Sequence, residues 1–270
     1  MEHGTHEFAY HGIGQNLLTF ESIMQHGIVS GDYAARNGID YTQRVKSFYD
    51  GLSFVSVALP HDTEGGNLKS DILNGGISFK TKPIDIEIPR FGSVSPDVGY
   101  IPDCISLNQI DGIIVNSSLR TKKISELEPI GHNSYASCPD IAFNIFSKLK
   151  GEVDFSSEQT ANFQDLLDSY NASISVFDID NCYKIKKQLN TFLSSAMERW
   201  YQQKLGKEDI SVMDIVEHYN QEKFPIYDEN DVKAQCVGKS VPEAFHKNSQ
   251  KYSRRNGFKN TRTHGTHGEL

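Results

Sequence analysis

Residues 8–59 read FAYHGIGQNLLTFESIMQHGIVSGDYAARNGIDYTQRVKSFYDGLSFVSVAL, and this stretch decides the fold. Its centre predicts a helix over residues 17–26, because leucine, phenylalanine, isoleucine and methionine recur on one side and a glycine follows. The β-forming residues before it predict a strand over residues 7–12, with the turn into the helix at residues 10–12. Residues 51–59 carry no charged side chain, which is typical of a strand buried on both faces of a sheet.

Two further strands are predicted in the first half of the chain. Residues 84–88 alternate apolar and acidic side chains, and residues 109–115 form a mostly apolar run. The helices interleaved with these strands are few and short. This order favours an α+β fold over a doubly wound parallel sheet, in which helices would alternate regularly with strands.

The character of the sequence changes at Pro139. Three later segments place apolar side chains at three- and four-residue spacing, which predicts amphipathic helices that pack through these side chains: residues 140–149, 183–205 and 212–219. We therefore expect three parts, namely a domain over residues 1–138, a helical extension over residues 139–235 and a basic, mobile tail over residues 236–270.

The 270-residue chain carries a formal net charge of −8. This balance disfavours general binding to nucleic acid, because counterion release rewards a basic surface. The exception is a local run of basic residues over 247–262. No stretch approaches the roughly 20 consecutive apolar residues that span a bilayer, so we expect no membrane segment. The first residues lack the basic and apolar segments of a secretory signal, and four widely spaced cysteines indicate reduced thiols in a cytosol-like compartment.

Two neighbouring motifs point to a family. A His11-Gly12 pair is followed by a helix that carries Ser22-Ile23 and ends in His26-Gly27-Ile28. In this order the residues resemble the opening of the ADP-ribosyltransferase-like family, which includes the poly-ADP-ribose polymerases, the tRNA 2′-phosphotransferases and the DNA-targeting DarT toxins. The resemblance covers roughly residues 8–116. It implies an ADP-ribosyltransferase-like split mixed sheet, with NAD as co-substrate and no metal.

The resemblance also implies roles for individual residues. A neutral imidazole can hydrogen-bond a ribose hydroxyl, and a glycine lets the backbone approach the nicotinamide carboxamide. His11 and Gly12 would therefore hold the nicotinamide riboside. The alternative is that His11 caps the strand and Gly12 turns the chain. Ser53, Phe54 and Ser56 would form the pocket wall.

The stacking residue and the diphosphate contact follow from the same resemblance. An aromatic side chain stacks on the nicotinamide ring in this family, and Tyr33, Tyr41 and Tyr49 are candidates that spacing does not rank. Arg44 stands where the DarT-like members place an arginine that can neutralise the diphosphate. An exposed structural arginine is the alternative reading of Arg44.

Asp103 is the candidate catalytic carboxylate, beside His11 as the second catalytic candidate. It precedes the apolar segment at residues 109–115, as the family's carboxylate does, and would stabilise the oxocarbenium-like transition state. The family usually has a glutamate at this place, whereas here Asp103 is followed by Cys104. Either Asp103 serves as a shorter carboxylate, or Glu87 or another acid does, or the chain is not a transferase.

The implied function is mono-ADP-ribosylation, the transfer of ADP-ribose from NAD to a macromolecule. A protein side chain is the expected acceptor, and nucleic acid is disfavoured by the net charge. NAD hydrolysis, removal of a 2′-phosphate from RNA, and an adaptor that binds partners through residues 183–205 remain alternatives. Transferases of this size with an added helical part are often bacterial toxins or effectors. The expected location is therefore the cytosol, or a host cytosol reached by a route other than Sec export.

Other enzyme classes have weaker support. The chain has ten histidines but no HExxH or comparable ligand spacing, which disfavours a metallohydrolase, and the HGTH strings at residues 3–6 and 264–267 are expected to be flexible ends. Cys104 and Cys138 are candidate nucleophiles by residue type alone, and His132 is close in sequence to Cys138, but nothing in the sequence indicates which histidine would face which thiol. The chain has no GxSxG motif that would indicate a serine hydrolase.

Overall fold

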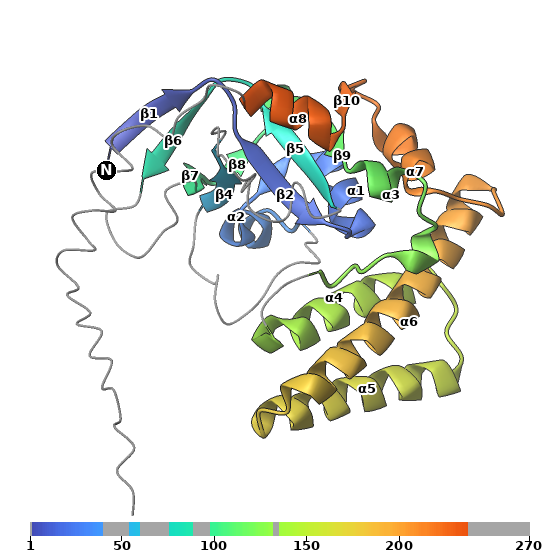
Figure 1. Cartoon of the computed structure of the whole chain (residues 1–270). Coiled ribbons are helices and arrows are strands. Elements are labelled where there is room, and N and C mark those ends of the chain that lie inside the picture. Colours follow the sequence, from blue (N-terminus) through green and yellow to red (C-terminus); the bar gives the residue numbers. More distant parts are fainter. Residues whose placement is uncertain (1, 40–53, 60–75, 89–97, 132–134, 237–270) are drawn as a thin grey trace, which may run out of the picture.

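The computed structural model describes residues 2–39, 54–59, 76–88, 98–131 and 135–236. It has an α+β fold, which confirms the fold class expected from the sequence. One mixed β-sheet has helices packed on it, and a region of longer helices follows along the chain (Figure 1). Within the described ranges, every helix is too short or too polar to cross a bilayer.

The described part of the chain contains the strands β1 (Glu2–His6), β2 (Tyr10–Gly14), β3 (Ile28–Val29), β4 (Phe54–Ala58), β5 (Ile77–Thr81), β6 (Ile84–Ile88), β7 (Val98–Pro102), β8 (Cys104–Ile105), β9 (Ile110–Val115) and β10 (Ile226–Tyr227). Its α-helices are α1 (Leu17–His26), α2 (Gly31–Arg36), α3 (Ser117–Arg120), α4 (Cys138–Lys150), α5 (Ser157–Ser175), α6 (Ile179–Leu205), α7 (Val212–Tyr219) and α8 (Glu229–Cys236). Short 3-10 helices lie at Leu107–Gln109, Ile124–Glu126 and Tyr135–Ser137.

The larger sheet has the strand order β1-β6-β7-β4-β2-β5-β9-β10, and β3 pairs separately with β8. Neighbouring strands are antiparallel except for β9 and β10, which run parallel. The sheet is mixed because the chain returns to it after the helical region: β10 adds an edge strand, and α8 follows directly. Residues 226–236 therefore belong to the sheet layer, although the sequence prediction assigned residues 226–235 to the helical extension and residue 236 to the tail.

Two pairs of neighbouring strands in this sheet share few residue pairs, and we call the boundary within each of these strand pairs a seam. In the described residues, β6 and β7 share one residue pair near an edge, and β2 and β4 share one pair, Tyr10 with Ala58, at the centre. By contrast, β4 and β7 pair continuously from Phe54 to Ala58. The central seam therefore separates a half made of β1, β6, β7 and β4 from a half made of β2, β5, β9 and β10.

Helix α1 covers one face of the sheet. Asn16 caps its first turn, where the side-chain oxygen accepts two backbone N–H bonds of 3.1 Å, and Gly27 ends it at φ +79°. Phe20 of α1 stacks on Phe79 of β5 with ring centroids 5.7 Å apart. The start and end of α1 agree with the prediction for residues 17–26.

Helix α8 covers the opposite face of β2. The Tyr10 hydroxyl lies 4.0 Å from the Cys236 sulfur, and a small buried cluster surrounds this contact. Its buried members are Phe8, Tyr10, Ile114, Val232 and Cys236. The central strand β2 is therefore covered on both faces, by α1 on one side and by α8 on the other.

Helices α4, α5 and α6 pack together beside the sheet, and α5 and α6 form a helical hairpin (Figure 1). Phenylalanines from this region form one aromatic cluster: Phe146, Phe155, Phe163 and Phe192. Phe146 and Phe163 stack with centroids 4.0 Å apart. The same hydrophobic core continues without a break from Ala9 in the sheet to Val216 in α7. The two regions therefore share one core.

Two local predictions are wrong. Residues 10–12 lie inside strand β2 and not at a turn. Residues 3–6, expected to be a flexible end, belong to β1, which pairs with β6 from Glu2 to His6. Both segments are ordered by strands distant in the sequence, and local composition does not report such partners.

Candidate functional site

The predicted site residues that the structure describes lie on β2 and β4, in α2 and directly after β7. Tyr10, Ala58 and Val98 form one row across β2, β4 and β7, because Tyr10 pairs with Ala58 and Ala58 with Val98. His11 follows this row on β2, and Asp103 follows the last residue of β7, which runs in the same direction as β2. Both residues therefore lie on the side where β2 and β4 separate.

His11 bridges the central seam. Its Nδ1 lies 2.9 Å from the backbone carbonyl oxygen of Ser56 on β4. Since a carbonyl oxygen only accepts, Nδ1 donates this hydrogen bond, and in the neutral imidazole Nε2 is then an acceptor. The imidazole is half-buried and the Ser56 side chain is exposed. Gly12, beside it, pairs with Ser78 of β5. The imidazole therefore belongs to β2, and its orientation is fixed by a hydrogen bond to β4 in the other half of the sheet.

Asp103 lies between β7 and β8 in the left-handed region, at φ +55°. Its carbonyl oxygen accepts a 2.8 Å bond from the backbone N–H of Ser30, and its carboxylate accepts a 2.7 Å bond from Arg36 Nη2. Ser30 in turn caps α2 through the backbone N–H of Tyr33. Aspartate is among the residues that tolerate this backbone conformation. The chain turn and the ion pair together fix where the carboxylate lies.

Tyr33 lies in the same cluster as Asp103. The Arg36 guanidinium is 6.0 Å from the centroid of the Tyr33 ring. Burial and the nearby Asp103 charge raise the pKa of the Cys104 thiol, whereas a hydrogen bond with Tyr33 acts in the opposite direction. The structure therefore brings Tyr33 and Asp103 together, with Arg36 and Cys104 as neighbours.

The structure does not bring the two groups of predicted residues into contact. His11 and Asp103 are separated by the width of β4, because β2 and β7 are its two neighbours. Two inter-strand spacings amount to about 9–10 Å, and Asp103 lies four residues further along the strand direction than His11, which adds about 13 Å. Phe54 begins β4 and pairs with Pro102, so its backbone lies between the groups. Arg44 and Ser53 lie outside the described residues.

Arg36 was missed by the sequence prediction, which placed the site's arginine at position 44. Its guanidinium binds two carboxylates, Asp103 at 2.7 Å and Asp32 at 3.4 Å. The signal that could have found it is the spacing of Asp32 and Arg36, four residues apart after a capping Ser30, which favours a pair on one helix face. Nothing local indicates that Asp103 would join them.

The alternative enzyme classes gain no support from the described residues. Burial, partly opposed by a hydrogen bond with Tyr170, raises the pKa of Cys138 to about 11, so the reactive thiolate is disfavoured at neutral pH. His132, its proposed partner, lies outside the described residues. Within the same ranges, no three His, Cys, Asp or Glu side chains are close enough to hold a metal ion. Glu87, the alternative carboxylate, lies on β6 and pairs with Tyr100.

Comparisons with family models, curated proteins and solved structures give no match for this chain. The geometry of the central seam is therefore the main guide to function. It combines an oriented imidazole on β2 with a carboxylate and a guanidinium beyond β4. The imidazole and the Asp103 carboxylate can accept hydrogen bonds from the hydroxyl groups of a ligand, whereas the Arg36 guanidinium is already paired with Asp103 and Asp32.

Proposed function

We propose that the protein is an NAD-dependent mono-ADP-ribosyltransferase, which cleaves the bond between nicotinamide and ribose and transfers ADP-ribose to a protein side chain. The observation that carries this proposal is the central seam, where β2 and β4 separate and the His11 imidazole is held by the Ser56 carbonyl. A ligand that enters beside a strand needs such an interruption, because a continuous ladder would occupy the backbone groups on both strands.

In this proposal His11 and Gly12 bind the nicotinamide riboside. Nε2 of His11 accepts a hydrogen bond from a ribose hydroxyl, and its orientation is set in advance by the bond from Nδ1 to Ser56. Gly12 lacks a Cβ, which leaves space for a planar carboxamide next to the strand. The binding groups are preorganised, so less free energy is lost in ordering them when the ligand arrives.

Asp103 supplies the negative charge that stabilises the developing oxocarbenium ion, and Arg36 positions it. The 2.7 Å bond to Arg36 fixes the orientation of the carboxylate. Tyr33, next to Arg36, is proposed as the ring that stacks on nicotinamide. Arg44 remains the proposed diphosphate contact, with Ser53, Phe54 and Ser56 along the pocket wall.

The test is a calorimetric titration with NAD, followed by measurement of nicotinamide release with and without a cell lysate as source of acceptor. We expect the intact protein to bind NAD, and His11→Ala to bind at least about tenfold more weakly, which corresponds to loss of about 1.4 kcal/mol. Its free energy of unfolding should stay within about 1 kcal/mol of the intact protein, since the imidazole is half-buried. The matched control is His218→Ala, an exposed histidine on α7.

Asp103→Asn separates catalysis from binding. If the carboxylate acts in the transition state, nicotinamide release should fall by a much larger factor than NAD affinity. Release that needs no lysate would reassign the protein as an NAD glycohydrolase. Absence of binding at millimolar NAD would overturn the proposal.

A further inference from the structure

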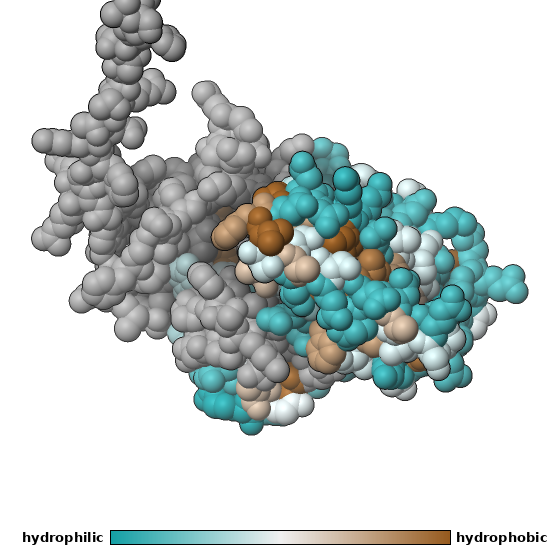
Figure 2. Space-filling model, turned by 90° about the horizontal axis from the view of Figure 1, so that it is seen from below, coloured by the Kyte–Doolittle hydropathy of each residue, from teal (hydrophilic) through white to brown (hydrophobic). Residues whose placement is uncertain are grey.

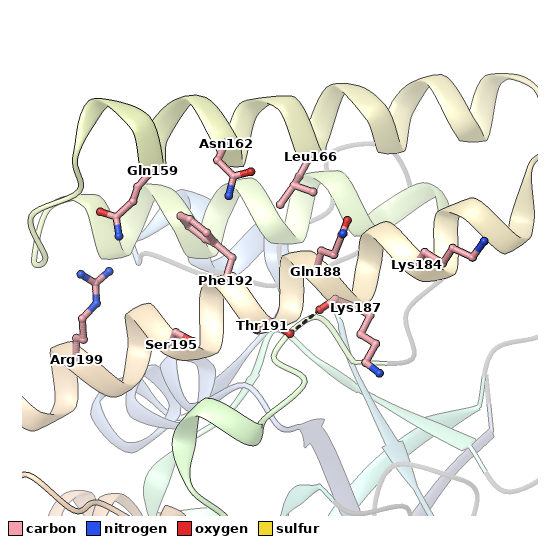
Figure 3. Close-up of a pocket in the computed structure, with 10 residues that line it drawn as sticks. All are labelled: Gln159, Asn162, Leu166, Lys184, Lys187, Gln188, Thr191, Phe192, Ser195 and Arg199. Atoms are coloured by element: carbon pink, nitrogen blue, oxygen red, sulfur yellow. Dashed lines mark hydrogen bonds between the residues drawn. The ribbon is translucent and has the colours of Figure 1, made fainter.

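Helices α5 and α6 enclose a groove with a volume of about 840 Å³, which lies in the helical region (Figure 3). Leu166 from α5 and Phe192 from α6 supply its apolar part, and amide and hydroxyl side chains surround them. Both apolar side chains are partly buried and pack on the core with their other side. The groove therefore offers a hydrophobic strip together with hydrogen-bonding groups on a rigid pair of helices.

The charged residues that line this groove are all basic, although the whole chain carries a net charge of −8. They are Lys184, Lys187 and Arg199, and among the described residues none of them forms an ion pair. Arg199 instead lies over the Phe155 ring, 5.6 Å from its centroid. A concentration of unneutralised positive charge in an acidic protein indicates a ligand that brings negative charge.

Two of these cations mark the ends of the groove. Arg199 lies near Gln159 at one end, and Lys184 lies at the other (Figure 3). Fifteen positions of α6 separate them, which corresponds to about 22 Å at 1.5 Å per residue. This length fits a helical segment of about 15 residues, or about seven residues of extended chain.

Exposed hydrophobic side chains lie just before Lys184 in the sequence, where α5 turns into α6. Val176 is 72% exposed, Phe177 84% and Tyr183 61%. Phe177 also has φ +57°, a backbone conformation that is unfavourable for an aromatic residue. Hydrophobic side chains are visible among hydrophilic ones on the face of the molecule in Figure 2. Such a patch beside a groove is typical of a surface that binds another protein.

We propose that this groove docks an acidic, amphipathic segment of a partner protein. The hydrophobic side chains of the segment would contact Leu166, Phe192 and the exposed tip of the hairpin, and its carboxylates would pair with Lys184 and Arg199. Docking involves only α5, α6 and the turn between them. It is therefore independent of the proposed reaction with NAD.

Two other occupants fit less well. A nucleic acid has evenly spaced phosphates and would bring some of them near the exposed acidic residues of α5, namely Glu158, Asp165 and Asp168, whereas a peptide can place its carboxylates only at the basic ends of the groove. The chain's own basic run at residues 247–262 has the same sign of charge as Lys184 and Arg199. A peptide with a few localised carboxylates avoids both conflicts.

The test uses the full-length protein without NAD to select from a displayed library of random 15-residue peptides. We expect the selected peptides to combine leucine or phenylalanine with several Asp or Glu, and synthetic copies to bind more weakly as salt is raised. Lys184→Glu and Arg199→Glu should each weaken binding at least tenfold, whereas Arg199→Lys should retain most of it. Lys82→Glu, an exposed lysine in the sheet region, is the control with the same change in charge.

Circular dichroism and melting temperature must be unchanged in each variant, and Lys184→Gln provides a milder second variant. The proposal is overturned if no peptides are selected, if the selected peptides are not acidic, or if they bind the groove variants as well as they bind Lys82→Glu. It is also overturned if a labelled 15-nucleotide oligouridylate binds and displaces the peptides. Loss of NAD cleavage in Asp103→Asn with peptide binding intact would leave this inference standing, so the two proposals fail separately.

Discussion

The helical region and the sheet are stabilised in different ways. Helices α4, α5 and α6 meet through a continuous phenylalanine cluster, with Phe146 and Phe163 stacked at 4.0 Å. The sheet is interrupted at its centre, where β2 and β4 share one residue pair and a half-buried His11 bridges the seam. The difference teaches that stability is concentrated where packing is continuous, and that polar groups able to bind a ligand stand where the pairing of strands stops.

The largest effect is expected from removing the most deeply buried ring of the aromatic cluster. Phe163→Ala should lower the free energy of unfolding by about 3–5 kcal/mol, because a buried ring is lost and a cavity remains. Phe177→Ala removes an 84% exposed ring from the same hairpin and should change stability by less than about 0.5 kcal/mol. Urea unfolding measures both. If the two variants lose similar amounts of unfolding free energy, continuous packing is not what stabilises the helical region.

Two glycines with positive φ sharpen the contrast between the regions. Gly27, between α1 and β3, has φ +79°, and a Cβ there would collide with the backbone carbonyl of Ile105. Gly206, after α6, has φ +66° and open space around the same position. We expect Gly27→Ala to cost about 3 kcal/mol and Gly206→Ala about 1 kcal/mol, the strain of a left-handed residue alone. Equal costs in thermal unfolding would show that the β3–β8 pair can move freely.

A polar contact joins the two regions. Lys204 of α6 donates a 2.8 Å hydrogen bond to the buried Glu21 of α1. Burial acts to lower the pKa of Lys204, but hydrogen bonds to Glu21 and Tyr219 outweigh it and the pKa is raised. Lys204→Met removes the partner of the buried Glu21 carboxylate and should cost about 2 kcal/mol, below the usual cost for a buried pair because the Lys204 side chain is about one-third exposed.

The double variant Glu21→Leu, Lys204→Met is the control for this pair. Replacing both partners by apolar residues should recover most of the lost stability, because no uncompensated charge remains. If Lys204→Met unfolds at the same urea concentration as the intact protein, the two regions are held together by their shared apolar core alone.

The smallest effect concerns the first turn of α7. Asp214 accepts hydrogen bonds from Lys207 and from the backbone and hydroxyl of Ser211, and these lower its pKa from 3.8 to about 2. A carboxyl with a depressed pKa in the folded state stabilises above its unfolded pKa, and the contribution disappears as the pH falls from about 4 to about 2.

Asp214→Asn should therefore cost about 1 kcal/mol at pH 7, and the difference from the intact protein should vanish near pH 2. Urea unfolding at pH 7, 4 and 2.5 follows this change. Asp209→Asn is the control, because its side chain is 87% exposed and its ion pair is worth little. A difference that stays constant with pH would mean that Asp214 acts through its shape and not through its charge.

The sequence predicted those elements correctly whose start and end are set by neighbouring residues. The bounds of α1 follow from Asn16 and Gly27 at its two ends. Helix α5 was missed, because it is mostly polar and turns a narrow stripe, including Phe163, Leu167 and Tyr170, toward the core. The candidate site was only partly accessible for another reason. The bond from His11 to Ser56 joins residues 45 positions apart, and the bond from Arg36 to Asp103 spans 67, so neither leaves a local pattern.

The contact between Tyr10 and Cys236 has a consequence for how the protein is made. The two residues are 226 positions apart, so the ribosome releases β2 long before α8. At about 5–20 residues per second, the face of β2 that α8 covers stays open for roughly 11–45 s. An uncovered apolar strand at that stage is open to aggregation or to capture by a chaperone. Arrival of α8 therefore closes this face of β2.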